Sequence, residues 1–349
     1  MHSQTIRLCL FYSLALVSTL SFLLTAYYLY APHLPRERTS GKLDPSSHQG
    51  PRYAYATFLS PPSPGVPDIA QDGYFTSVRL LNYQIRHANR TKSQIPVGGE
   101  VAHLPFLVLA LSSVPVYQTS ILEGEGATII PIETLDLPDR FDISFIENSR
   151  FQHVATKLRL WQITGYDKIL YLDADSFLLD RLDDIFEAPG FSEERKTDFD
   201  KTNGNSVEKL PMPERYLMAA SIDSYGDQRE WEQPGHINYL CGCFMLLKPS
   251  EILFQYYIDV LMGPDAPPNA LYPDQDFLSF IYRKDGPMPW SRIPIEWSAN
   301  DGGMVEVLEG RLKSLHVKSW EPAEGGNIAD EKTKHVWMAL VQEMENYYY

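Results

Sequence analysis

The short apolar run at residues 169–172 constrains the fold of this chain more than any other segment. A continuous apolar run of strand length is typical of a strand buried on both faces of a parallel sheet. Two carboxylates, Asp173 and Asp175, follow the run directly. In open α/β sheets, ligands bind at the carboxyl ends of the strands. The segment therefore predicts a buried strand that ends either in a ligand site or in a solvated acidic loop.

Two carboxylates at a strand end have a definite chemical use. Carboxylate oxygens ligate hard divalent cations, and two of them leave coordination positions open for the oxygens of a diphosphate. Asp173 and Asp175 are therefore candidate metal ligands.

Segments of strand and helix length alternate on both sides of this motif. Helices are predicted where apolar residues recur at three- and four-residue spacing, as Val154, Leu158 and Trp161 do. The alternation predicts an α/β fold whose mostly parallel sheet is covered by helices on both faces. The predicted strands occupy residues 53–59, 106–111, 127–132, 216–222 and 243–247, and the predicted helices occupy 75–87, 149–165 and 251–262.

The N-terminal region predicts a membrane anchor. Residues 8–30 carry no charged side chain and are rich in Leu, Phe, Tyr and Ala. About 20 such residues span a bilayer as a helix, whereas the apolar part of a cleaved signal peptide usually has about 7–15. The length favours a transmembrane signal anchor at 8–30 over a cleaved signal, with a short tail at 1–7 before it and a flexible stem at 31–52 after it. The flanking basic residues leave the orientation open.

The overall composition excludes one class of partner. The 349 residues carry 30 Lys and Arg against 45 Asp and Glu, a formal net charge of −15. A nucleic-acid-binding protein needs a basic footprint, so we expect no nucleic-acid partner. A nucleotide substrate is compatible with this charge, because a bound metal and a few local cations reverse the field within one cleft. Among the three cysteines, Cys241 and Cys243 are predicted to stand too close together for an ordinary disulfide.

Four motifs in a fixed order resemble one protein family. They are the predicted helix with Lys157 and Trp161, the Asp173-Ala-Asp175 segment, the pair Asp274-Gln275, and His316-Val-Lys318 near the end of the chain. Together they resemble glycosyltransferase family 8, the group that contains glycogenin, and the resemblance runs from about residue 53 to residue 322. It implies a GT-A fold, which is the Rossmann-like nucleotide-diphospho-sugar transferase architecture, and a transfer that retains the anomeric configuration.

The resemblance also implies the donor and the metal. The donor would be a UDP-sugar, and Asp173, Asp175 and His316 would hold Mn²⁺ or another divalent cation that bridges its diphosphate. The chemistry agrees, because carboxylates with one imidazole suit Mn²⁺ better than an all-oxygen magnesium cage or a thiolate zinc site. Lys157 and Lys318 would place ammonium groups on the same diphosphate.

The remaining family positions concern the sugar and the nucleoside. Asp274 and Gln275 would lie near the anomeric carbon as catalytic groups, acting either as a nucleophile or as stabilisers of an oxocarbenium-like transition state. Thr57 and Tyr74 are candidates for contacts with the base and ribose. One departure stands out: Leu240 replaces a polar amide that the family commonly has there. Asn238 or His236 could compensate, and the donor sugar stays open.

These implications predict the organisation of the chain. A single catalytic domain would occupy 53–325, with a surface insertion at 191–215 and a C-terminal tail or helix at 326–349. The anchor would make the protein a single-pass type II membrane protein of the Golgi or another secretory compartment, with its catalytic domain in the lumen. The acceptor could be a glycan, a lipid or a protein.

Two other functions compete with this one. Haloacid-dehalogenase-type phosphatases also place Asp-x-Asp after an apolar strand, but that motif normally opens their domain. A membrane-anchored, non-catalytic binding or scaffold protein derived from a transferase is the second alternative, and Leu240 is its main support.

Overall fold

The structure, a computed structural model, describes residues 52–62, 72–97, 100–138, 150–201, 210–223, 238–263, 273–300, 310–320 and 329–349. The chain divides into two compact units, Met1–Gln49 and Gly50–Tyr349. All described residues belong to the second unit, so the predicted tail, anchor and nearly all of the stem lie outside them. Within the described ranges, no helix combines the length and the apolar composition that crossing a membrane requires.

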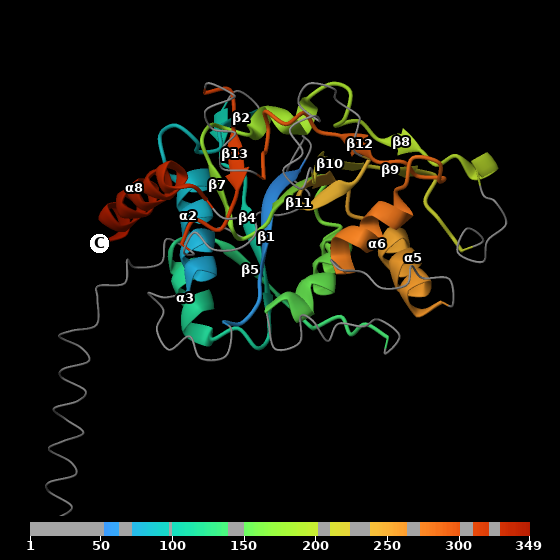
Figure 1. Cartoon of the computed structure of the whole chain (residues 1–349), viewed down its shortest axis with the longest axis horizontal. Helices are drawn as coiled ribbons and strands as arrows, with labels where there is room; N and C mark the ends of the chain where they lie inside the picture. Colours follow the sequence, from blue (N-terminus) through green and yellow to red (C-terminus); the bar gives the residue numbers. More distant parts are fainter. Residues whose placement is uncertain are drawn as a thin grey trace, which may run out of the picture. The chain divides into compact units, whose positions relative to one another are not determined.

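A seven-stranded sheet forms the centre of the second unit (Figure 1). Its strands follow one another in the order β12, β10, β11, β6, β1, β4 and β5. β6, β1, β4 and β5 run parallel, whereas β11 runs antiparallel to both of its neighbours. The α/β class is confirmed, and the sheet is mixed. The bounds are β1 Tyr53–Leu59, β4 Phe106–Leu111, β5 Thr128–Ile132, β6 Lys168–Leu172, β10 Met218–Ile222, β11 Leu240–Leu247 and β12 Ser291–Arg292.

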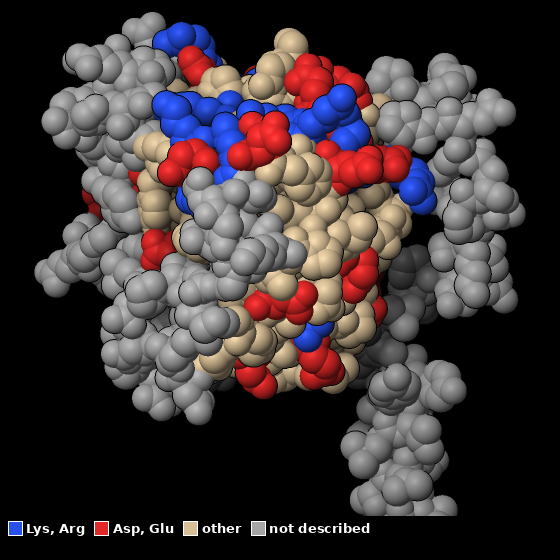
Figure 2. Space-filling model, turned by 90° about the vertical axis from the view of Figure 1, so that its right-hand side faces the viewer, with Lys and Arg blue, Asp and Glu red and all other residues tan. Residues whose placement is uncertain are grey.

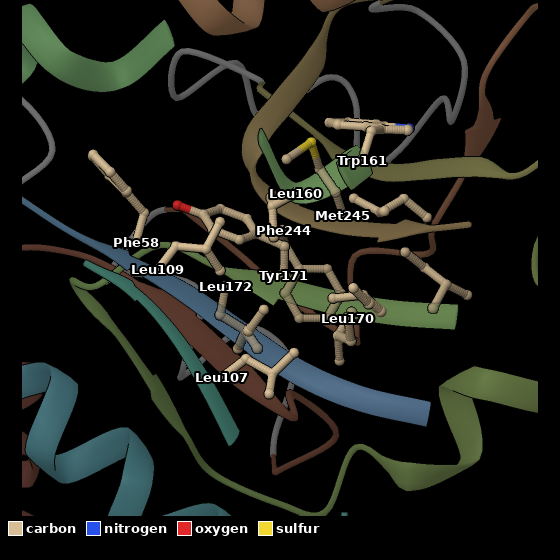
Figure 3. Packing of buried hydrophobic residues seen from close by; sticks show 14 of the residues in the cluster. Phe58, Leu107, Leu109, Leu160, Trp161, Leu170, Tyr171, Leu172, Phe244 and Met245 are labelled. Atoms are coloured by element: carbon tan, nitrogen blue, oxygen red, sulfur yellow. The ribbon is translucent and has the colours of Figure 1, made fainter. Parts of the chain in front are cut away.

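The central strands are buried because their side chains are apolar on both faces. Every residue of β1, β4 and β11 is buried. Figure 3 shows Leu170 and Leu172 of β6 packed with Phe244 and Met245 of β11, below Trp161 of the neighbouring helix. A continuous apolar run therefore does predict a strand covered on both faces here.

Helices lie to either side of the sheet. Figure 1 places α2 (Gly73–Arg86) and α3 (Val116–Gly124) to one side of the central strands and α5 (Glu251–Met262) and α6 (Pro273–Ile281) to the other. Ser250 caps α5 by accepting a hydrogen bond from the Leu253 amide, at 3.3 Å. That serine is visible in the sequence, and the predicted helix at 251–262 matches α5.

The helix before β6 differs from the prediction. Residues Arg150–Gln162 form a 3₁₀ helix, η3, and not an α-helix. The predicted cap at Ser149 lies outside the described residues. Side chains three positions apart stack along a 3₁₀ helix, and Val154 and Lys157 accordingly line the same pocket. Because of this period Lys157 points into the protein, and its side chain is 6% exposed.

A second apolar cluster joins α2 to the last helix, α8 (Glu331–Tyr348), which lies beside it in Figure 1. It contains Leu80 of α2 and Trp337 of α8, and the Trp337 indole donates a hydrogen bond to Ser77 at 3.2 Å. The same cluster includes residues of two short strands, β7 (Ser176–Leu178) and β13 (Ser314–His316), which pair antiparallel. The C-terminal segment is thus packed onto the domain.

The charged face in Figure 2 shows Lys and Arg side chains in a band with Asp and Glu side chains among them. The short pair β8 (Arg195–Lys196) and β9 (Arg215–Tyr216) belongs to this side of the molecule. There Glu194 pairs with both Lys248, at 2.7 Å, and Arg215, at 3.7 Å. An acidic partner thus neutralises both of these basic side chains. The other two-stranded pair is β2 (Ile95–Val97) with β3 (Glu100–Ala102).

Candidate metal and donor site

The Asp-x-Asp motif lies where the sequence predicts it, at the carboxyl end of a buried strand. Asp173 follows β6, and its amide continues the ladder by donating to the carbonyl of Cys243 at 2.8 Å. The chain then turns, since the Ser176 amide donates to the Asp173 carbonyl at 3.0 Å. The turn presents Asp173 and Asp175 at the same edge of the sheet as the end of β1, the strand beside β6.

A short strand pair brings His316 to this turn. β13 pairs with β7 so that His316 stands opposite Ser176, next to the acidic motif. The Val317 amide fixes the register by donating to the Asp175 carbonyl at 3.2 Å. The third candidate ligand therefore reaches the first two through a backbone ladder, and the rigidity of that ladder holds the group together.

The three side chains converge. The His316 Nε2 atom lies 2.9 Å from Asp175 Oδ1 and 3.8 Å from Asp173 Oδ2. One ligand atom from each residue lies within 4.8 Å of the other two. The side chains are 12%, 8% and 24% exposed for His316, Asp175 and Asp173, so the group is only partly open to solvent. Two carboxylates and one imidazole at this spacing fit a divalent cation such as Mn²⁺.

Without a cation, His316 and Asp175 stabilise each other's charge. Burial alone would lower the pKa of His316, but the Asp175 and Asp173 carboxylates outweigh burial, and the pKa is raised. Burial alone would raise the pKa of Asp175, but His316 and then Lys318 outweigh it, and the pKa is lowered. The site thus keeps its carboxylate ionised, which is the form that binds metal.

Lys157 lies behind the acidic motif as a buried cation. Its ammonium is 2.9 Å from Asp173 Oδ1 and 2.6 Å from Asp274 Oδ2, and it donates to the Gly242 carbonyl at 3.3 Å. Burial by itself lowers the pKa of Lys157, yet Asp173 and Asp274 raise it overall, so the lysine is charged. One cation thus ties the Asp-x-Asp motif to the Asp274-Gln275 motif.

Tyr171 is a site residue that the sequence prediction missed. Its hydroxyl donates to Asp173 Oδ1 at 2.6 Å, and burial, followed by the charge of Asp173, raises its pKa well above the usual value. Asp173 Oδ1 therefore has two donors, Tyr171 and Lys157, while Oδ2 faces His316. The tyrosine sits inside the apolar run of β6, where an aromatic residue normally signals packing.

Gln275 is oriented by groups that the sequence did not single out. Its Oε1 atom accepts from the Gly242 amide at 2.8 Å, and its Nε2 atom donates to Asp223 at 2.8 Å. Asn300 donates to the other oxygen of Asp223 at 3.1 Å. Asp223 directly follows the buried strand β10, as Asp173 follows β6. A carboxylate directly after an apolar run thus marks a site residue twice in this chain, and this pattern could have identified Asp223 from the sequence.

A small pocket adjoins these groups. Lys157, Asp173 and Asp175 line it together with Ser60 after β1 and Tyr74 of α2. Lys318 does not line the pocket, but its ammonium lies 6.0 Å from the centre of the ring of Tyr74, which does. Thr57 lies apart: it is fully buried within β1, does not line the pocket, and its hydroxyl has no hydrogen-bond partner among the described residues.

The Trp320 ring packs against the first two residues of α2. Its ring stands edge-on to Tyr74, with 4.9 Å between the ring centres. A Cβ atom at Gly73 would clash with the Trp320 ring, so only glycine fits there. Tyr74, the predicted nucleoside contact, thus lies in the first turn of α2 with Trp320 and Lys318 close to its ring.

The structure corrects one prediction around β11 and shows the surroundings of Leu240. Cys241 and Cys243 are joined by a disulfide, although their separation in sequence suggested that they could not be. The reason is a bulge in β11, which draws their Cα atoms to 5.1 Å from each other. Leu240 is completely buried in the main core, so it packs rather than lining the pocket. Asn238 is exposed, and His236 lies outside the described residues.

Comparison with known proteins places the chain among distant relatives. No family model matches it. It is 26% identical over 291 residues to an uncharacterized protein of Schizosaccharomyces pombe, which covers 77% of this chain and 73% of that protein. It is 25% identical over 252 residues to galactinol synthase 4 of Arabidopsis thaliana, covering 69% of this chain and 64% of the synthase.

One shorter match has a higher sequence identity. A putative glucuronosyltransferase of Arabidopsis thaliana is 36% identical over 86 residues, which is 24% of this chain and 17% of that protein. Among solved structures, a glycosyltransferase of Streptococcus pneumoniae superposes with a TM-score of 0.48 at 14% identity, covering 84% of this chain and 63% of its own. The S. pombe protein and galactinol synthase 4 thus match most of this chain, whereas the putative glucuronosyltransferase matches about a quarter of it.

Proposed function

We propose that the protein is a nucleotide-sugar glycosyltransferase that binds its donor through a divalent cation at Asp173, Asp175 and His316. The observation that carries the proposal is the convergence of these three side chains within 4.8 Å from two distant segments of the chain. The similarity to galactinol synthase 4 and to a putative glucuronosyltransferase supports the class of enzyme. The finer assignments are a GT-A fold, a UDP-sugar donor, Mn²⁺, and retention of the anomeric configuration.

We propose different roles for the site residues in binding the donor. When bound, the cation would neutralise charge that develops on the leaving diphosphate. We propose that Lys318 adds a point charge to the same anion and that Tyr74 packs against the nucleoside; the Lys318 ammonium lies 6.0 Å from the centre of the Tyr74 ring. Lys157 holds Asp173 and Asp274 in position, because it forms an ion pair with each of them. Thr57 stays a predicted contact for the base or ribose, although it is fully buried within β1.

The Asp274-Gln275 pair is proposed to face the reacting sugar. Gln275 cannot rotate freely, since the Gly242 amide and Asp223 hold the two ends of its amide group. Asp274 is buried and paired with Lys157, an arrangement that keeps a negative charge available to stabilise positive charge on the sugar ring. The acceptor is proposed to be a glycan, a lipid or a protein.

The organisation of the chain is part of the proposal. Residues 8–30 would anchor the protein as a type II membrane protein of the secretory pathway, with residues 53–325 as the lumenal catalytic domain. Asn89 begins an Asn-Arg-Thr glycosylation sequon and is exposed at the end of α2, as a lumenal location requires of a modified asparagine.

A ligand screen tests this function. The thermal unfolding of the purified protein is measured with UDP-glucose, UDP-galactose, UDP-N-acetylglucosamine and UDP-glucuronate, each with and without Mn²⁺. A ligand present at a hundred times its Kd stabilises the native state by about 2.7 kcal/mol. We expect stabilisation by at least one UDP-sugar only when Mn²⁺ is present, followed by slow hydrolysis of that donor.

Two outcomes would replace the proposal. Turnover of p-nitrophenyl phosphate without any effect of UDP-sugars would indicate a phosphatase. The lack of any Mn²⁺-dependent nucleotide binding would favour a non-catalytic scaffold.

A further inference from the structure

The disulfide between Cys241 and Cys243 lies within an irregular part of β11. On β10, Ala220 and Ile222 pair with Met245 and Leu240, so Ser221 alone stands opposite residues 241–244. This surplus of residues is a β-bulge, a feature that often re-aims side chains beside functional sites. The two cysteines bracket Gly242 at the centre of the bulge.

The backbone of this bulge holds the donor site together. Gly242 accepts from Lys157 through its carbonyl and donates to Gln275 through its amide, at 3.3 and 2.8 Å. The Cys243 carbonyl accepts from the Asp173 amide at 2.8 Å. A Cβ atom on Gly242 would stand 2.9 Å from Asp274 Oδ2, so the backbone itself approaches that carboxylate. All the acidic motifs of the site thus depend on a bulge that one covalent bond closes.

The sulfur atoms also approach the third candidate ligand. Cys241 and Cys243 offer sulfur atoms within 4.8 Å of a ring nitrogen of His316. The disulfide therefore lies next to the proposed metal site, and both cysteines are buried at 3% exposure.

We propose that the Cys241–Cys243 disulfide is a reversible redox control on donor binding. This inference rests on the proposed function, because it names the regulation of the same site. A dithiol, either a small molecule or a protein, would reduce the bond: the S–S bond breaks, each cysteine sulfur gains one electron and one proton, and the reductant becomes a disulfide. Oxidation reverses these steps and restores the closed bulge.

The geometry explains why reduction would loosen the site. Each residue of a regular strand advances by about 3.3 Å, so residues two apart would lie about 6.6 Å apart. The disulfide instead holds the Cα atoms of Cys241 and Cys243 at 5.1 Å. Without the cross-link the bulge is free to extend toward the regular spacing. That movement would withdraw Gly242 from Lys157 and Gln275. Asp173 and Asp274 would then lose their orientation, because Lys157 holds both of them.

Linkage gives the control a second signature. If reduction weakens donor binding by a given factor, donor binding must protect the disulfide from reduction by the same factor. Groups that support metal ligands typically change metal affinity or activity by about 10–100-fold when they are removed. We therefore expect at least a tenfold effect in each direction, and a tenfold shift in the thiol–disulfide equilibrium corresponds to about 30 mV for this two-electron couple.

The test compares the oxidised and the reduced full-length protein. A Cys9→Ser background leaves the pair as the only cysteines, and alkylation followed by mass measurement gives the fraction reduced. The affinity for UDP with Mn²⁺ is then measured before and after treatment with a phosphine reductant. We expect at least a tenfold loss on reduction, recovery on reoxidation, and no response to reductant in a Cys241→Ala/Cys243→Ala variant. Equal affinity in both states would overturn the proposal.

Hydrogen exchange separates this proposal from the proposed function. The Gly242 amide is protected by Gln275 whatever ligand the site binds, and we expect exchange in residues 240–244 to accelerate at least tenfold on reduction. If no nucleotide binds in either state but this acceleration occurs, the proposed function fails and the redox device stands. Unchanged exchange would refute the device even in a protein that binds UDP-sugars.

Discussion

Two buried ion clusters in this protein look alike but differ in charge balance. Arg79 of α2 and Glu125 after α3 form one, with a hydrogen bond of 2.7 Å from Nε and side chains 10% and 8% exposed. Lys157 with Asp173 and Asp274 forms the other. The arginine has one carboxylate, and the aromatic rings of Tyr348 and Tyr349 cover it.

The surplus of carboxylates at the second cluster distinguishes a binding site from a structural pair. Asp175 joins Asp173 and Asp274 there, and Lys157 contacts two of these carboxylates while the charge of Lys318 acts on Asp175. His316 compensates only while it carries a proton. Uncompensated buried charge is unfavourable unless a ligand neutralises it. The surplus therefore supports the proposed cation site, whereas the Arg79–Glu125 pair is balanced in charge.

The largest effect should come from removing one candidate ligand. A metal contributes several kcal/mol of charge stabilisation, so Asp175→Asn should lower kcat/KM for the preferred UDP-sugar by on the order of a thousandfold. Asp184→Asn is the matched control, since Asp184 is exposed on the short helix η4 (Asp183–Glu187) and makes the same change of charge. Retention of Mn²⁺-dependent binding by the Asp175 variant would show that the carboxylate surplus serves another purpose.

Replacing each buried cation separates the two clusters. Removing one partner of a buried ion pair destabilises a protein by about 3–5 kcal/mol, so both Arg79→Met and Lys157→Met should lower the free energy of unfolding in urea by that order. Only Lys157→Met should also weaken donor binding per folded molecule, because only Lys157 positions Asp173 and Asp274.

The distinction between the two clusters would be wrong if Arg79→Met and Lys157→Met had the same effect on donor binding. An Arg79→Met protein that loses donor binding as fully as Lys157→Met, measured below the temperature at which either unfolds, would mean that both pairs are structural supports of one site.

The pH dependence of metal binding should follow His316. Its folded pKa is raised, so in the metal-free protein its contribution to stability is fully present below the unfolded pKa and is lost as pH rises through the folded pKa. Metal binding has the opposite sign, because the cation displaces the proton. Below the folded pKa of His316 we expect Mn²⁺ affinity to fall by about tenfold per pH unit, which corresponds to one released proton.

Calorimetric titration with Mn²⁺ at several pH values measures this slope. The loss should begin at a higher pH than for an ordinary histidine, and His316→Gln should flatten the dependence. A slope that persists in the His316 variant would assign the proton to another group.

The smallest effect concerns the C-terminal helix α8, which packs on α2 and whose end covers the Arg79–Glu125 pair. Asp330 caps α8 by accepting from the Thr333 amide at 2.7 Å. Asp330→Ala should therefore reduce stability by about 1 kcal/mol, detected as a small fall in Tm, with donor affinity unchanged. A change in donor affinity would show that α8 communicates with the site.

The parts of the fold that could be predicted are those encoded locally. The strand Tyr53–Leu59 and the helix Glu251–Met262 have the predicted bounds, because an apolar run or a serine cap marks their ends. The position of Asp173 and Asp175 followed from the same run. The 3₁₀ form of η3 could not be predicted, since its apolar spacing also fits an α-helix.

The parts that could not be predicted depend on pairing between distant segments. β7 and β13 have three residues each and bury their side chains only when they meet. The role of Tyr171 depends on the position of Asp173 within the folded site. The disulfide required the bulge in β11, which exists only because β10 and β6 flank that strand. In each case local sequence leaves the partner undefined.

The packing of α8 on α2 has a consequence for the order of folding. Hydrogen bonds join Trp337 to Ser77 and Glu343 to Tyr83, contacts between segments 260 positions apart in the chain. During synthesis, the side of α2 that carries Leu80 and Tyr83 stays without its α8 partner until α8 has left the ribosome, whereas the strands around β1 have partners much earlier. We therefore expect nascent chains halted before α8 to expose α2 to chaperones, because domains of this size commonly pass through intermediates with exposed apolar surface.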